Sequence, residues 1–156
     1  MYGAAVNGLA QVRLFSLREA NALVATLQEQ FERARELHDE LGAVQSQLTQ
    51  AGHPMSESEP PKVDRTAPPA VQRLQRGVMR ILDELRGVLN GVAELGVEVK
   101  APDGLVDLRS KLHGRTVYLC WRYGEDRITH YHELETGFAG RRPIPADADF
   151  VGDLMH

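Results

Sequence analysis

Two long segments of the chain carry apolar residues at alternating spacings of three and four positions, the period of a helix that buries one stripe. Ser16 followed by Glu19 has the pattern of a capping box, in which a hydroxyl and a carboxylate satisfy free amides at a helix start. Gly96 is a natural helix end. We therefore predict helices over residues 17–50 and 70–95, which pack antiparallel as a long hairpin.

The segment between the two predicted helices, residues 52–69, combines proline, serine and charged residues with almost no apolar side chain. Such a composition cannot bury enough apolar surface to repay the entropy of ordering. We therefore predict a mobile loop.

Each predicted helix has a second apolar column beside its main stripe, and one hairpin cannot cover both columns. The sequence therefore predicts a homodimer formed through the hairpin. The second column consists of Leu23, Leu37 and Val44 in the first helix and of Met79, Leu82 and Leu89 in the second.

Residues 97–144 change to short runs rich in β-branched and aromatic side chains, which are typical of β-strands. The last two runs, TVYLCWR and RITHYHE, flank a turn sequence and predict a β-hairpin. With the turn at Gly124 and Glu125, strand alternation places His132 on the same face as Trp121.

The expected fold class is α+β, with the long antiparallel helical hairpin of residues 17–95 followed by a small antiparallel β cap at residues 97–144. The acidic end, residues 145–156, is expected to be a loose tail. At 156 residues the chain has the size of one ordinary domain, so residues 1–156 are expected to form a single domain.

Composition excludes several classes of protein. The net charge of −4 argues against a nucleic-acid binder, which needs basic residues to displace counterions from phosphate. Neither a signal peptide nor an apolar membrane span is recognisable. Cys120 is the only cysteine, so it cannot form an intramolecular disulfide, and this fits a reducing compartment. We expect a cytoplasmic protein that binds neither nucleic acid nor membrane.

Five segments carry a resemblance to a known family: LFSLREAN at 14–21, ELGVEVK at 94–100, GLVDL at 104–108, YLCWRYGE at 118–125 and HELETGFAGRRPI at 132–144. Together they resemble the domain-of-unknown-function 2203 family of bacterial proteins. The chain departs from the pattern at His130, where an aromatic residue is expected, so His130 is not expected to carry a role shared by the family. Because the family is uncharacterised, the resemblance implies a fold and motif boundaries but no reaction.

Familiar catalytic motifs are missing from the sequence: there is no phosphate loop, dinucleotide fingerprint, HExxH pair or GxSxG elbow. What remains is a group of carboxylates and a histidine. Antiparallel pairing of the helices brings Glu19 toward Glu94, and His132 and Asp107 of the cap are expected beside them. Imidazole and carboxylates can ligate zinc, manganese or iron. The sequence thus predicts a divalent metal site made of these four residues.

Three of the four proposed ligands also have a structural explanation. Glu19 is accounted for by its capping box, Glu94 by a solvated helix face, and His132 by a hydrogen-bonded position in the core. Cys120, flanked by apolar and aromatic neighbours, is expected to be a buried structural cysteine.

The glycine-rich segment GFAGRR could hold an anion, because glycines let backbone amides converge and arginines add positive charge. Arg122 and Arg141 are the candidate anion contacts. The alternative is a tight turn that tucks Phe138 into the cap.

Two functions remain open. The first is a metal-binding protein, with or without a metal-dependent enzymatic activity, with its site between the cap and the open end of the hairpin. The second is a non-catalytic, dimeric coiled-coil assembly or a protein-interaction module. We favour metal binding, because HEL-x-x-GFAGR places polar residues where a purely structural cap would need none. No catalytic residue is assigned.

Overall fold

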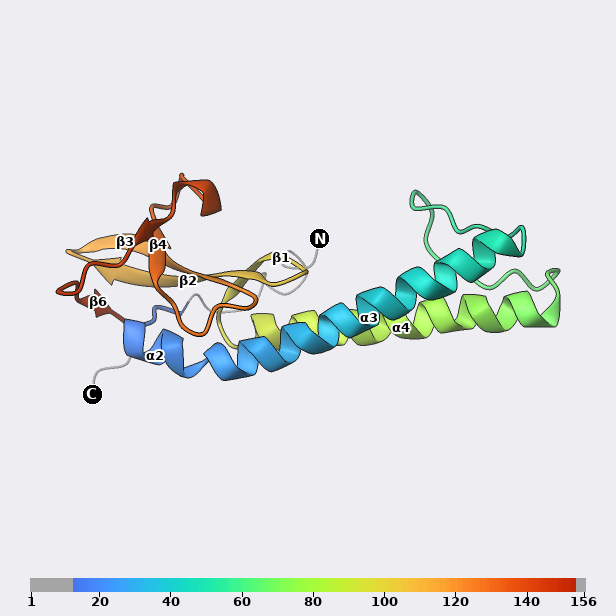
Figure 1. Ribbon diagram of the computed structural model, residues 1–156, viewed down its shortest axis with the longest axis horizontal. Coiled ribbons are helices and arrows are strands. Elements are labelled where there is room, and N and C mark those ends of the chain that lie inside the picture. Colours follow the sequence, from blue (N-terminus) through green and yellow to red (C-terminus); the bar gives the residue numbers. More distant parts are fainter. Residues whose placement is uncertain (1–12, 154–156) are drawn as a thin grey trace. The chain divides into compact units, whose positions relative to one another are not determined.

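The computed structural model describes residues 13–153 and shows an α+β protein whose strands form an antiparallel sheet (Figure 1). The helices are α2 (Leu17–Ala22), α3 (Val24–Gln50), α4 (Pro69–Ala93) and the short 3₁₀ helix η1 (Phe138–Gly140). The strands are β1 (Glu98–Ala101), β2 (Leu105–Leu112), β3 (Arg115–Arg122), β4 (His130–His132), β5 (Arg142–Pro143) and β6 (Phe150–Val151).

The chain divides into two compact units. One contains the described residues up to Glu32 together with those from Leu89 onward, and it holds the whole sheet. The other is Arg33–Val88, which consists of the later part of α3, the connecting loop and most of α4. Within the described residues, no helix is long and apolar enough to cross a lipid bilayer.

The predicted first helix begins where the capping box requires. The Ser16 hydroxyl accepts a hydrogen bond from the Glu19 amide at 3.1 Å, and the Glu19 carboxylate accepts one from the Ser16 amide at 2.8 Å. The helix is interrupted at Leu23, whose amide donates to the carbonyl of Ala20 in a tighter turn, so residues 17–50 form α2 and α3 instead of one helix.

In the unit Arg33–Val88, two ion pairs connect α3 to α4. Arg33 lies 2.8 Å from Glu84, and Arg80 lies 3.0 Å from Glu40. The earlier residue of α3, Arg33, pairs with the later residue of α4, Glu84, whereas the later residue Glu40 pairs with the earlier residue Arg80. The two helices therefore run in opposite directions here. These exposed pairs each contribute little to stability, because solvent screens them.

The second apolar column is partly covered by the chain itself. Leu37 and Leu89 are buried, whereas Met79 is 42% exposed. The apolar surface left for a partner is therefore smaller than the sequence pattern indicated.

The sheet has the order β1-β2-β3-β4-β5, and β6 pairs with β2. On one edge, β2 pairs with β3 along its whole length. On its other edge, β2 pairs with β1 at one end and with β6 at the other. The segment before α2 fills the space between them: the Phe15 amide donates to the carbonyl of Arg109 at 2.7 Å. This contact anchors the start of the helical region to the sheet.

The expectation of a loose tail over residues 145–156 is wrong for its described part. Phe150 and Val151 form β6, which pairs with Leu112 and Lys111 of β2. Phe150 is buried, and its ring centroid lies 5.5 Å from that of Tyr131. The burial of this one aromatic side chain orders a segment that otherwise looks acidic and polar.

The two faces of the sheet differ in character. One face is apolar and includes Leu119 and Trp121, whose ring centroid lies 6.0 Å from that of Phe31 in α3. The other face carries polar side chains from β1 to β4, including the candidate site.

The face predicted for His132 is wrong. His132 is the register partner of Tyr118, and Tyr131 is the partner of Leu119, so His132 lies on the face opposite to Trp121. The connection between β3 and β4 spans residues 123–129 and is longer than the two-residue turn expected. A change of one residue in register moves every side chain of a strand to the other face.

Candidate metal centre

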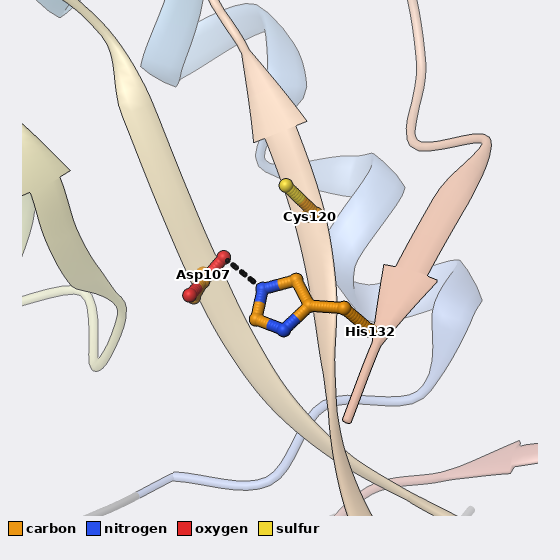
Figure 2. A group of neighbouring side chains, drawn as sticks. All are labelled: Asp107, Cys120 and His132. Carbon is orange, nitrogen blue, oxygen red and sulfur yellow. Dashed lines mark hydrogen bonds and ion pairs between the residues drawn. The ribbon is translucent and has the colours of Figure 1, made fainter. Parts of the chain in front are cut away.

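Three potential metal ligands project from neighbouring strands onto the polar face of the sheet (Figure 2). Asp107 of β2 and Cys120 of β3 are direct register partners, and His132 of β4 lies two pairs further along, opposite Tyr118. One ligand atom from each residue lies within 4.8 Å of the other two. The residues are 4%, 0% and 1% exposed, respectively, so the group is closed off from solvent.

The imidazole of His132 is held at both nitrogens. Its Nδ1 lies 2.7 Å from the carbonyl oxygen of Glu133, and its Nε2 lies 3.0 Å from Oδ1 of Asp107. A carbonyl oxygen can only accept, so Nδ1 carries a proton and donates it. The contact between Nε2 and the Asp107 carboxyl group therefore contains a second proton, which the two residues share.

Burial raises the pKa of each of the other two groups. It raises the pKa of Asp107 above its usual value, although the hydrogen bond to His132 opposes this effect. Burial also raises the pKa of Cys120 to about 12, with a further contribution from the negative charge of Asp107. Without a metal ion, Cys120 is therefore a protonated thiol at neutral pH and not a nucleophile.

A second network borders the group. Glu98 of β1, the register partner of Asp107, accepts hydrogen bonds from the Tyr118 hydroxyl at 2.8 Å and from Arg109 Nε at 2.9 Å. Burial raises the pKa of Glu98, but these hydrogen bonds and one from Lys100 outweigh it and lower the pKa. The pKa of Glu98 is thus shifted in the opposite direction to that of Asp107.

Tyr118 connects this network to the site. Its ring centroid lies 5.4 Å from that of His132, at an interplanar angle of 48°. Because the hydroxyl group of Tyr118 is held by Glu98, the ring forms a fixed wall against the imidazole. His132 is therefore oriented by packing as well as by its two hydrogen bonds.

The structure brings together two of the four residues predicted as ligands, Asp107 and His132, and adds Cys120. Among the described residues this is the group that could hold an ion, and Glu19 and Glu94 are not part of it. Glu19 accepts from the Ser16 amide in the capping box, and Glu94 is exposed.

Cys120 was missed because the expected two-residue turn placed it on the face opposite to His132. A sequence signal did exist, since Asp107 lies between the apolar residues Val106 and Leu108, and Cys120 lies between Leu119 and Trp121.

The candidate anion contacts, Arg122 and Arg141, lie on either side of one aromatic ring. Their guanidinium carbons are 5.4 Å and 4.6 Å from the ring centroid of Phe138, and Arg141 also pairs with Glu125 at 2.9 Å. The Nε atom of Arg141 is buried and has no hydrogen-bond partner among the described residues. Anion binding by these arginines stays a prediction.

The fold and the site define an α+β protein whose antiparallel sheet carries a buried carboxylate, thiol and imidazole on its polar face. Comparison with known families identifies the chain further. It belongs to the family described as uncharacterized conserved protein (DUF2203), which matches residues 13–144 and confirms the resemblance of the sequence motifs. Neither a curated protein nor a solved structure matches the chain.

Proposed function

We propose that this protein binds one divalent transition metal ion through Asp107, Cys120 and His132. The observation that carries the proposal is the convergence of a carboxylate oxygen, a thiol sulfur and an imidazole nitrogen within 4.8 Å of one another. Around a tetrahedral ion with bonds of about 2.0–2.3 Å, ligand atoms lie roughly 3.5 Å apart. Small side-chain rotations therefore suffice to close the group around an ion.

The arrangement of His132 supports the same proposal. Histidines that bind metals through Nε2 commonly donate Nδ1–H to a carbonyl or carboxylate, which fixes the tautomer and the ring. His132 already makes this bond to the Glu133 carbonyl. Its Nε2 atom faces Asp107, where an ion would replace the shared proton.

Charge balance favours a divalent ion. A thiolate, a carboxylate and a neutral imidazole together carry two negative charges, which one divalent cation neutralises in this buried position. The thiolate favours zinc or iron over manganese, whose preferred ligands are oxygens. A cytoplasmic location belongs to the proposal, because Cys120 must stay reduced to bind a metal.

Elemental analysis of the full-length protein, purified without chelators, tests the function. We expect about one metal ion per chain, and added zinc should raise the melting temperature of the chelated protein. His132→Ala should lose the ion. Glu19→Gln and Glu94→Gln are matched controls, because both remove a carboxylate outside the group. A metal-free protein that gains no thermal stability from zinc would overturn the proposal.

We also propose that the α3 and α4 hairpin, antiparallel over its full length, forms a homodimer. Met79 supports this, since it is 42% exposed on α4 and lies one helical turn from Leu82. Light scattering should give about twice the chain mass of 17.3 kDa, and Met79→Glu should shift it toward the monomer. A monomer at tens of micromolar protein would contradict this second proposal.

A further inference from the structure

Three protein ligands leave one position of a tetrahedral ion unfilled. Structural zinc sites fill all four positions with protein side chains, whereas catalytic sites leave one position for water or substrate. We propose that His130 supplies the fourth ligand, so that the site is a closed one of one carboxylate, one thiolate and two imidazoles. This inference rests on the proposed metal binding.

The register of the sheet places His130 next to the group. His130 of β4 is the direct partner of Cys120 in β3, and Cys120 is the direct partner of Asp107 in β2. The three residues form one row across three strands, on one face. Directly opposed residues have Cβ atoms about 4.5–5.5 Å apart, so an imidazole at His130 reaches the space beside the Cys120 sulfur without a change in the backbone.

His130 and His132 project from the same face of β4, on the two sides of this space. Residues two apart in a strand are separated by roughly 6.5 Å, a spacing that two imidazoles can bridge through one ion. Without a metal, Nδ1 of His130 lies 2.8 Å from the Thr129 hydroxyl, an exposed contact. Rotation of the side chain exchanges this contact for a bond to the ion.

Accessibility points to the same residue. Asp107, Cys120 and His132 are at most 4% exposed, whereas His130 is half-buried. An ion must come from solvent, and within the row Asp107, Cys120 and His130 only His130 is partly exposed. The ring then covers the bound ion once it is in place.

The competing occupant of the fourth position is a small anion. Arg141 has a buried Nε without a hydrogen-bond partner among the described residues, and its positive charge opposes the rise in the pKa of Cys120. If such an anion bound the metal ion beside Arg141, the fourth position would be exchangeable and not filled by a protein side chain.

Cobalt(II) loaded into the chelated full-length protein tests this choice, because its visible absorption reports coordination number and thiolate ligation. The wild type should show a four-coordinate spectrum that added azide or thiocyanate does not change. His130→Ala and His130→Gln should both change the spectrum, make it respond to added azide, and bind zinc at least about tenfold more weakly. His38→Ala, which removes an exposed histidine of α3, should match the wild type.

The outcomes separate the two proposals. If His132→Ala abolishes binding while both His130 variants keep the wild-type spectrum and affinity, the fourth-ligand inference is overturned and metal binding stands. A wild-type spectrum that changes with azide also overturns it, since the position is then open. A wild-type protein that binds neither cobalt nor zinc overturns both. Circular dichroism of each variant confirms that the sheet has formed.

Discussion

Nε2 of His132 lies 3.0 Å from Oδ1 of Asp107, and both side chains are buried in the polar face of the sheet. The contact reaches from β4 across β3 to β2, so it depends on the pairing of three strands. A carboxyl group whose pKa is raised by burial and an imidazole whose Nδ1 already donates share one proton there. This contact between His132 and Asp107, together with the adjacent Cys120, leads to four testable predictions.

Removing the imidazole should destabilise the metal-free protein. His132→Ala removes the imidazole that hydrogen-bonds the buried Asp107 carboxyl group, whereas the Glu133 carbonyl keeps its hydrogen bonds from Thr136. The loss at Asp107 should cost about 1–3 kcal/mol of unfolding free energy. Urea unfolding in the presence of a chelator measures the change. His38→Ala is the control, because the residue it removes is exposed. Equal stability of the two variants would show that the His132 contacts carry no net stability.

Metal affinity should rise with pH. The ion replaces the thiol proton of Cys120, whose pKa is raised to about 12, and the proton shared by Asp107 and His132. Binding should therefore release about two protons near neutral pH, and affinity should fall up to roughly 100-fold for each unit of acidification. Calorimetry in buffers of different ionisation enthalpy counts the protons. Binding without proton release would contradict ligation by Cys120.

The raised pKa of Asp107 predicts how the metal-free protein responds to pH. A carboxyl group with a higher pKa in the folded than in the unfolded state contributes stability below the unfolded value of about 3.9. That contribution is lost as pH rises through the folded pKa. Asp107→Asn imitates the protonated carboxyl group at every pH.

The stability of Asp107→Asn relative to the wild type should therefore increase as pH rises through this window. Urea titrations of both proteins at several pH values, with a chelator present, measure the difference. A constant difference between the two proteins would mean that Asp107 titrates alike in the folded and unfolded chain.

Cys120 should be nearly inert in the folded, metal-free protein. A thiol with a pKa of about 12 is far less ionised at pH 8 than an unfolded cysteine with a pKa of about 8.5, and its burial blocks reagents as well. Labelling by a thiol reagent should be at least about 1000-fold slower in buffer than in urea. Cys120→Ser sets the background signal. Rapid labelling of the native protein would show that the thiol is exposed or ionised.

Local patterns in the sequence were sufficient to predict where the helices lie. The capping box of Ser16 and Glu19 sets the start of α2, and the three-four spacing predicts α3 and α4 closely, because both depend on residues within one or two turns. The break at Leu23 was not predictable, since the apolar stripe continues through it and only the backbone turn reveals it.

Strand positions could also be read from local composition, but their pairing could not. The connection over residues 123–129 sets the register of β4 against β3, and its length follows from how the whole segment packs. In this register, His132 lies on the same face of the sheet as Cys120 and on the face opposite to Trp121. The sequence alone therefore determined that Asp107 and His132 were candidate ligands. Only the tertiary structure placed Cys120 beside them and left Glu19 and Glu94 outside the group, because side chains from separate strands meet only after those strands pair.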